Sequence, residues 1–88
     1  MADTTGNAGA VEKADNLLHD AQGRYAGAGF AEMLGQKADA KKMREDVARM
    51  IREAYALDAE YCEECRKEDQ ETGGTYASFW QFAEAVTA

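Results

Sequence analysis

The sequence has 88 residues, of which 45% are hydrophobic and none is proline, and its formal charge is −7. A chain of this length forms one domain, which buries only about 60–65% of its unfolded surface and has a thin margin of stability. Ten basic residues against seventeen acids disfavour binding to nucleic acid or to an anionic membrane, because both require a positive protein surface. An acidic surface is better suited to a basic partner protein.

The first ten residues, MADTTGNAGA, are small and polar and lack the apolar core of a signal peptide. No stretch approaches the roughly 18 apolar residues of a membrane span. We therefore expect a cytoplasmic protein, with residues 1–8 as a disordered leader and residues 9–88 as a single helical domain.

A first helix is predicted from Gly9 to about Tyr25. Its apolar residues recur at spacings of three and four: Val11, Ala14, Leu18, Ala21 and Tyr25. Glycines at 23, 27 and 29 then lower helix propensity by about 1 kcal/mol each, so the sequence predicts a turn there. A short helical turn should follow and end near Gly35.

A long helix is predicted from about Lys37 to Glu71, ended by Gly73-Gly74. Its apolar positions follow a seven-residue repeat: Ala40, Met43, Val47, Met50, Ala54, Leu57 and Tyr61. Such a helix would be about 50 Å long, whereas the predicted first helix is about 25 Å long. Since one short helix cannot cover this seam, we expect an all-α homodimer with a long central helix, and a dimer seam formed by Met43, Val47, Met50, Ala54, Leu57 and Tyr61.

Charge is distributed unevenly along this long helix. Residues 37–52 contain six basic residues and three acids, whereas residues 58–71 contain seven acids and two basic residues. That order opposes the helix macrodipole, and an antiparallel partner would compensate by placing basic halves beside acidic halves. The alternative is that the charges form only pairs within the helix, such as Glu45 with Arg49.

The last fourteen residues, TYASFWQFAEAVTA, form the most apolar and aromatic segment of the chain. Ser78 with Gln81 has the spacing of a helix-capping box, and Thr75 is a competing cap. The sequence predicts a helix that is buried against the core or the dimer, with an exposed aromatic anchor for a partner as the alternative.

Two thiols, Cys62 and Cys65, are the strongest candidates for a chemical site. Their spacing places both sulfurs on one helix face, but structural zinc needs four ligands and the chain offers only His19 besides. We expect ordinary packing residues and no resident cofactor; the alternatives are zinc ligands completed by a second copy, or a functional disulfide. His19 has no identifiable catalytic partners, so the sequence does not favour an enzyme.

The favoured hypothesis is a small acidic interaction protein that binds a basic protein, including one that itself binds nucleic acid, and that inhibits or regulates it. The predicted contact residues are the acids near the end of the long helix: Asp58, Glu60, Glu63, Glu64, Glu68, Asp69 and Glu71. Small proteins of this kind suit phages and other mobile elements. The alternative function is a metal- or small-ligand-binding bundle that uses Cys62 and Cys65 or an aromatic-lined pocket.

Overall fold

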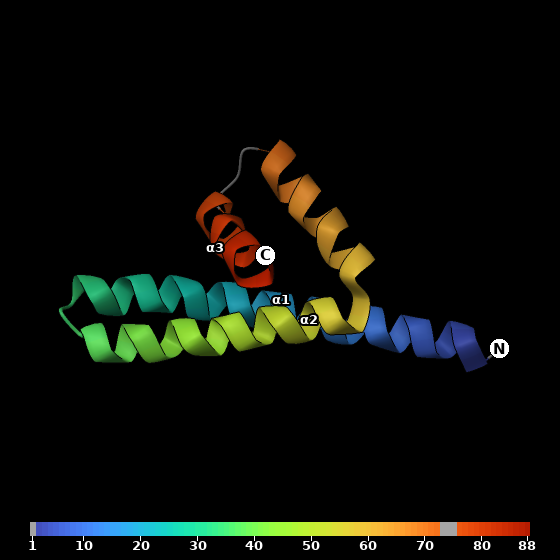
Figure 1. Ribbon diagram of the computed structural model, residues 1–88, viewed down its shortest axis with the longest axis horizontal. Helices are drawn as coiled ribbons and strands as arrows, with labels where there is room; N and C mark the ends of the chain where they lie inside the picture. The colour runs from blue at the N-terminus through green and yellow to red at the C-terminus, as the bar shows by residue number, and fades with distance from the viewer. Residues whose placement is uncertain (1, 73–75) are drawn as a thin grey trace.

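The computed structural model describes residues 2–72 and 76–88 of the chain. Three helices follow one another in these residues: α1 (Ala2–Met33), α2 (Lys37–Glu71) and α3 (Ala77–Thr87) (Figure 1). The predicted all-α class is confirmed, and the arrangement is a small helical bundle. The helix α1 begins at Ala2, ahead of the predicted start at Gly9, and the predicted disorder of the leader stays a prediction.

The predicted turn between Gly23 and Gly29 is wrong, because α1 continues through all three glycines to Met33. This part of α1 lies against α2, and a Cβ atom added at Gly27 would stand 2.9 Å from the Met43 Cε atom. Ala28 and Ala31 are buried on the same stretch of helix. Small residues let the two helices approach closely, and the resulting packing outweighs the poor helix propensity of glycine.

Gly35 ends α1, as the sequence predicts. Its φ of 81° is the left-handed conformation that glycine adopts without steric cost. The Gly35 amide donates to the carbonyl of Glu32 at 3.0 Å, and the Gln36 amide donates to that of Ala31 at 2.9 Å. This is the Schellman pattern of helix termination, and it turns the chain tightly into α2.

The helix α2 has the predicted bounds, Lys37–Glu71, but it is not the single uninterrupted helix that the sequence predicts, because it bends at Asp58. Asp58 alone has non-helical backbone angles, φ −159° and ψ 88°. Its Oδ1 atom accepts a hydrogen bond from the Tyr61 amide at 3.0 Å, which is the geometry of a helix N-cap. Asp58 therefore starts a new helical direction, and we call residues 37–57 the basic arm and residues 59–71 the acidic arm of α2.

Antiparallel packing of α1 on the basic arm forms a helical hairpin (Figure 1). The acidic arm leaves this hairpin at a steep angle, and α3 lies between the arm and the hairpin. With 32 residues, α1 is about 48 Å long and covers the basic arm, which is about 30 Å long. The predicted homodimer depended on a first helix too short to cover the long helix, and that argument no longer holds. The homodimer itself stays a prediction.

The six residues predicted as a dimer seam face the chain's own core to different extents. Val47 and Ala54 have no exposed surface, Met50 and Tyr61 pack against the core, and Leu57 is 40% exposed. Met43 is half-buried beside α1.

All three helices contribute to one core, as the apolar pattern of the sequence indicates. Its buried members are Ala14, Leu18, Ala21, Val47, Ile51, Ala54, Cys62, Phe79, Trp80 and Ala83. The expected burial of the aromatic C-terminal segment is thus confirmed for Phe79 and Trp80.

The predicted cap at Ser78 is wrong: α3 begins at Ala77, and the exposed Ser78 hydroxyl forms a hydrogen bond with the Tyr25 hydroxyl of α1 at 2.7 Å. Thr75 and the Gly73-Gly74 helix stop lie outside the described residues, and α2 ends at Glu71 with Thr72 as its C-cap.

Candidate functional site

Asp58 and the acidic arm together carry the seven residues predicted to bind a partner, and three of those seven have structural partners. Asp58 caps the arm through the Tyr61 amide. The Glu63 carboxylate accepts hydrogen bonds from Arg66 and from the Tyr55 hydroxyl. Asp69 accepts a hydrogen bond from the Trp80 indole nitrogen at 2.6 Å. These three carboxylates hold the fold together and are less available to a partner.

The other four predicted carboxylates lie on one face of the acidic arm. We call them the acidic stripe: Glu60, Glu64, Glu68 and Glu71, all of them exposed. At 3.6 residues per turn they fall within about 80° of the helix circumference and span about 16 Å. Cys62 and Asp69 lie on the opposite side, where the arm packs against the rest of the bundle.

The acidic stripe is not neutralised by neighbouring cations. Among the side chains that the structure describes, no Lys or Arg nitrogen lies within 4.0 Å of a stripe carboxylate. Lys67 shares this face of the helix and is exposed, so the face keeps a net negative charge. Four like charges on one face repel one another, and a cationic ligand would relieve that repulsion.

A charged network fixes the arm to α3. Arg66, whose side chain is only 21% exposed, pairs with Glu63 at 2.9 Å and with Glu84 of α3 at 3.1 Å. The hydrogen bonds from Arg66 and then from Tyr55 lower the pKa of Glu63 to about 2. Burial, followed by the contact with Glu63, raises the pKa of the Tyr55 hydroxyl, which therefore stays protonated. This network holds the acidic stripe in a fixed orientation.

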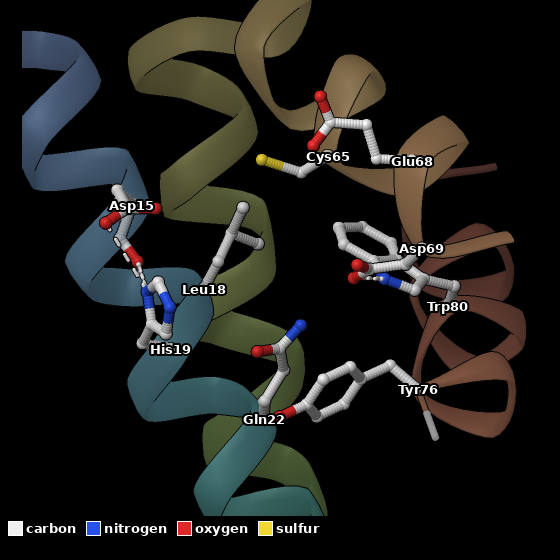
Figure 2. A pocket seen from close by; sticks show the side chains of 9 residues that line it. All are labelled: Asp15, Leu18, His19, Gln22, Cys65, Glu68, Asp69, Tyr76 and Trp80. Atoms are coloured by element: carbon white, nitrogen blue, oxygen red, sulfur yellow. Dashed lines mark hydrogen bonds and ion pairs between the residues drawn. The ribbon is translucent and has the colours of Figure 1, made fainter. Parts of the chain in front are cut away.

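A cavity of about 150 Å³ lies where the acidic arm, α1 and α3 meet (Figure 2). Its lining residues are Asp15, Leu18, His19, Gln22, Cys65, Glu68, Asp69, Tyr76 and Trp80. Figure 2 shows Asp69 against the Trp80 indole on one wall, and the Tyr76 hydroxyl directed toward Gln22 at the lower end. Three carboxylates and two aromatic rings are a lining suited to a small organic cation. Glu68 belongs to both this cavity and the acidic stripe.

The two cysteines occupy different environments on the packed side of the arm. Cys62 is fully buried, and burial raises the pKa of its thiol to about 12. Cys65 is half-buried, and burial also raises its thiol pKa. Both are free thiols, and no cluster of three or more potential metal-ligating side chains occurs in the described part of the chain. The pair resembles the packing residues favoured by the sequence more than activated thiols.

His19 is exposed, and its Nδ1 atom donates to the backbone carbonyl of Asp15 at 2.9 Å, one turn earlier in α1. It lines the same cavity as the Cys65 thiol, but among the described residues its ring pairs only with Asp15. The expectation that this chain is not an enzyme stays a prediction.

The bend in α2 brings together residues that the sequence did not connect. Asp15 of α1 and Tyr61 of the acidic arm are 46 positions apart, yet the Tyr61 hydroxyl donates to the Asp15 carboxylate. This contact exists only because α2 bends. The signal that could have revealed the bend is Asp58 followed by Ala59 and Glu60, a typical N-cap with an acidic first turn.

Comparison with known proteins adds no assignment: no family model, curated protein or solved structure matches this chain. Among the residues that the structure describes, no helix combines the length and the apolar character of a membrane span.

Proposed function

We propose that this protein binds a basic surface of another protein through the acidic stripe, and that it regulates that protein by occupying the surface. The observation that carries the proposal is the row of four exposed carboxylates on one helix face, with no cation in pairing distance among the described side chains. Their regular spacing along about 16 Å suits a row of Lys or Arg side chains. A partner site that normally takes nucleic acid would present such a row.

The arm behind the stripe supports this proposal, because a fixed surface loses little conformational entropy on binding. Arg66 joins the arm to α3, and Asp69 joins it to the buried Trp80. The carboxylates themselves extend from a helix and not from a loop. Opposite charges steer association, so the rate of binding should fall as the salt concentration rises.

Neutralisation of the stripe tests the proposal with a fluorescent oligoarginine peptide as the probe. If each carboxylate contributes about 0.4 kcal/mol, replacing all four by Gln should weaken binding by about fifteenfold at low salt. A matched control removes the same charge from other faces, through Glu12→Gln, Asp20→Asn, Glu45→Gln and Glu53→Gln, all at exposed positions. Equal weakening by both variants would mean that only net charge matters and would contradict a defined stripe.

A lysate experiment then addresses the natural partner. The wild type and the two charge variants are used as baits in parallel, and bound proteins are compared by mass spectrometry. A basic protein captured by the wild type and the control, but lost with the stripe variant, would support the proposal.

The cavity supports a second candidate function, the binding of a small organic cation. The observation that favours it is that Asp69, Glu68 and the rings of Tyr76 and Trp80 line one cavity of about 150 Å³. Trp80 is the only tryptophan, so its fluorescence reports on this site directly. Titration with arginine methyl ester should change the emission and saturate, and a Glu68→Gln variant should weaken the effect. An unchanged spectrum at millimolar ligand would exclude this candidate.

A further inference from the structure

The bend in α2 is confined to a single residue. The chain is helical before and after Asp58, and no loop separates the basic arm from the acidic arm. The seven-residue apolar pattern keeps its phase across the bend, since Leu57 and Tyr61 continue the spacing of the basic arm. Neither glycine nor proline occurs between Gly35 and Gly73. The same residues are therefore able to form one uninterrupted helix.

We call residues 59–88 the exchange segment. Side-chain contacts attach it to the hairpin, and these contacts could equally form between two different copies of the chain. Tyr61 donates to Asp15, and Ser78 hydrogen-bonds Tyr25. The ring of Tyr25 also contacts Phe79 and Phe82 at centroid distances of 5.8 and 5.3 Å. An identical segment from a second copy would make the same contacts with this hairpin.

The bent and the straight forms of α2 therefore differ chiefly at the hinge. In the bent form Asp58 satisfies the Tyr61 amide, but a helix start leaves further N–H groups without partners inside the helix. In the straight form the N–H groups at the start of the acidic arm regain backbone carbonyl partners, and the hydrogen bond from the Tyr61 amide to the Asp58 side chain is lost.

We propose that two copies of this chain form a domain-swapped dimer, in which each copy gives its exchange segment to the other and Asp58 is the hinge. In the monomer the segment covers its own hairpin; in the dimer α2 is straight, and the segment covers the hairpin of the other copy. The occupant of this surface is thus a second copy, and protein concentration and the hinge residue control the balance. This inference is independent of the acidic stripe and of its partner.

Two substitutions at the hinge should shift the balance in opposite directions. Ala59 is exposed and occupies the first position of the acidic arm, where proline is well tolerated. Ala59→Pro excludes a helical Asp58 and would clash with the Tyr55 carbonyl in a straight helix, so the dimer should weaken at least a thousandfold. Asp58→Ala removes the cap and favours the straight helix, so the dimer dissociation constant should fall by about thirtyfold, since each dimer contains two hinges.

Sedimentation velocity over a range of protein concentrations measures both effects, and circular dichroism checks that the Ala59→Pro variant is folded. Mixing isotope-labelled and unlabelled Asp58→Ala chains then identifies the exchange, because NOEs between the Tyr25 and Phe82 rings should appear between copies. A monomeric Asp58→Ala variant at millimolar concentration would overturn the proposal. So would a folded Ala59→Pro variant that dimerises like the wild type, or a dimer that lacks those NOEs.

Discussion

The individual carboxylates of residues 58–71 have different roles, although the sequence presents them as one run. Asp58 caps a helix, Asp69 binds the indole of Trp80, and Glu63 pairs with Arg66, whereas the stripe residues have no such partner among the described side chains. A carboxylate that accepts a hydrogen bond from a buried donor contributes more to stability than an exposed one.

Asp69→Ala should lower the free energy of unfolding by about 1–3 kcal/mol, because the Trp80 N–H loses its acceptor inside the bundle. The control is Glu68→Ala, the adjacent residue, which is exposed and should change stability by less than about 0.5 kcal/mol. Urea unfolding followed by Trp80 fluorescence measures both. Similar losses for the two variants would contradict the role assigned to Asp69.

The ion pair between Glu63 and Arg66 predicts a specific pH dependence. The pKa of Glu63 is lowered from 4.5 to about 2 in the folded protein, so the pair stabilises the fold above about pH 4.5. This contribution is lost as the pH falls toward 2, because the folded form must then take up a proton. Since the Glu63 side chain is 44% exposed, we expect at most about 1 kcal/mol.

Urea unfolding at about pH 5 and about pH 2.5 should show that Glu63→Gln loses less stability on acidification than the wild type does. Glu64→Gln is the control, because it removes the same charge from a neighbouring residue of the acidic stripe. If Glu64→Gln flattened the pH dependence as much as Glu63→Gln, the ion pair would not be its source.

At the scale of the helices, the spacing of apolar residues predicted the buried faces correctly, whereas helix propensity predicted a turn that does not exist. The three-four pattern of Ala14, Leu18 and Ala21 correctly marked the buried face of α1. The glycine-rich stretch was misread because its helix depends on packing against α2, and that contact is not a local property of the sequence. Only at Gly35 did the backbone need glycine, and the predicted stop there was right.

Alanine substitutions at the glycines should separate these cases. Gly23→Ala and Gly29→Ala should each raise the free energy of unfolding by about 0.5–1 kcal/mol, since nothing lies within 4 Å of an added Cβ atom. Gly27→Ala should raise the free energy of unfolding by less, because the Met43 side chain must move to make room for the added Cβ atom. Gly35→Ala should cost about 1 kcal/mol or more, because its positive φ is unfavourable for alanine. Urea unfolding gives the order, and a destabilised Gly23→Ala would contradict a continuous α1.

For the whole molecule, the bend at Asp58 determines where the charges lie. It places the acids Asp58 and Glu60 at the start of a helix, where they complement the dipole that a straight rod would oppose. It also creates the cavity, by bringing the acidic arm toward α1 and α3. The sequence predicted the helix but not the bend, because the apolar repeat passes through Asp58 unbroken. The Asp58 cap and tertiary contacts such as Tyr61 with Asp15 together stabilise the bent form.

Backbone NMR chemical shifts of the dilute wild-type protein test this bend most directly. We expect helical Cα shifts for residues 50–57 and 59–68, with a non-helical Cα shift at Asp58 alone. NOEs between the rings of Tyr25 in α1 and Phe79 in α3 should accompany them, since the ring centroids lie 5.8 Å apart. An unbroken run of helical shifts through Asp58 in a monomeric sample, without those NOEs, would contradict the bend and the arrangement of the cavity and the acidic stripe that depends on it.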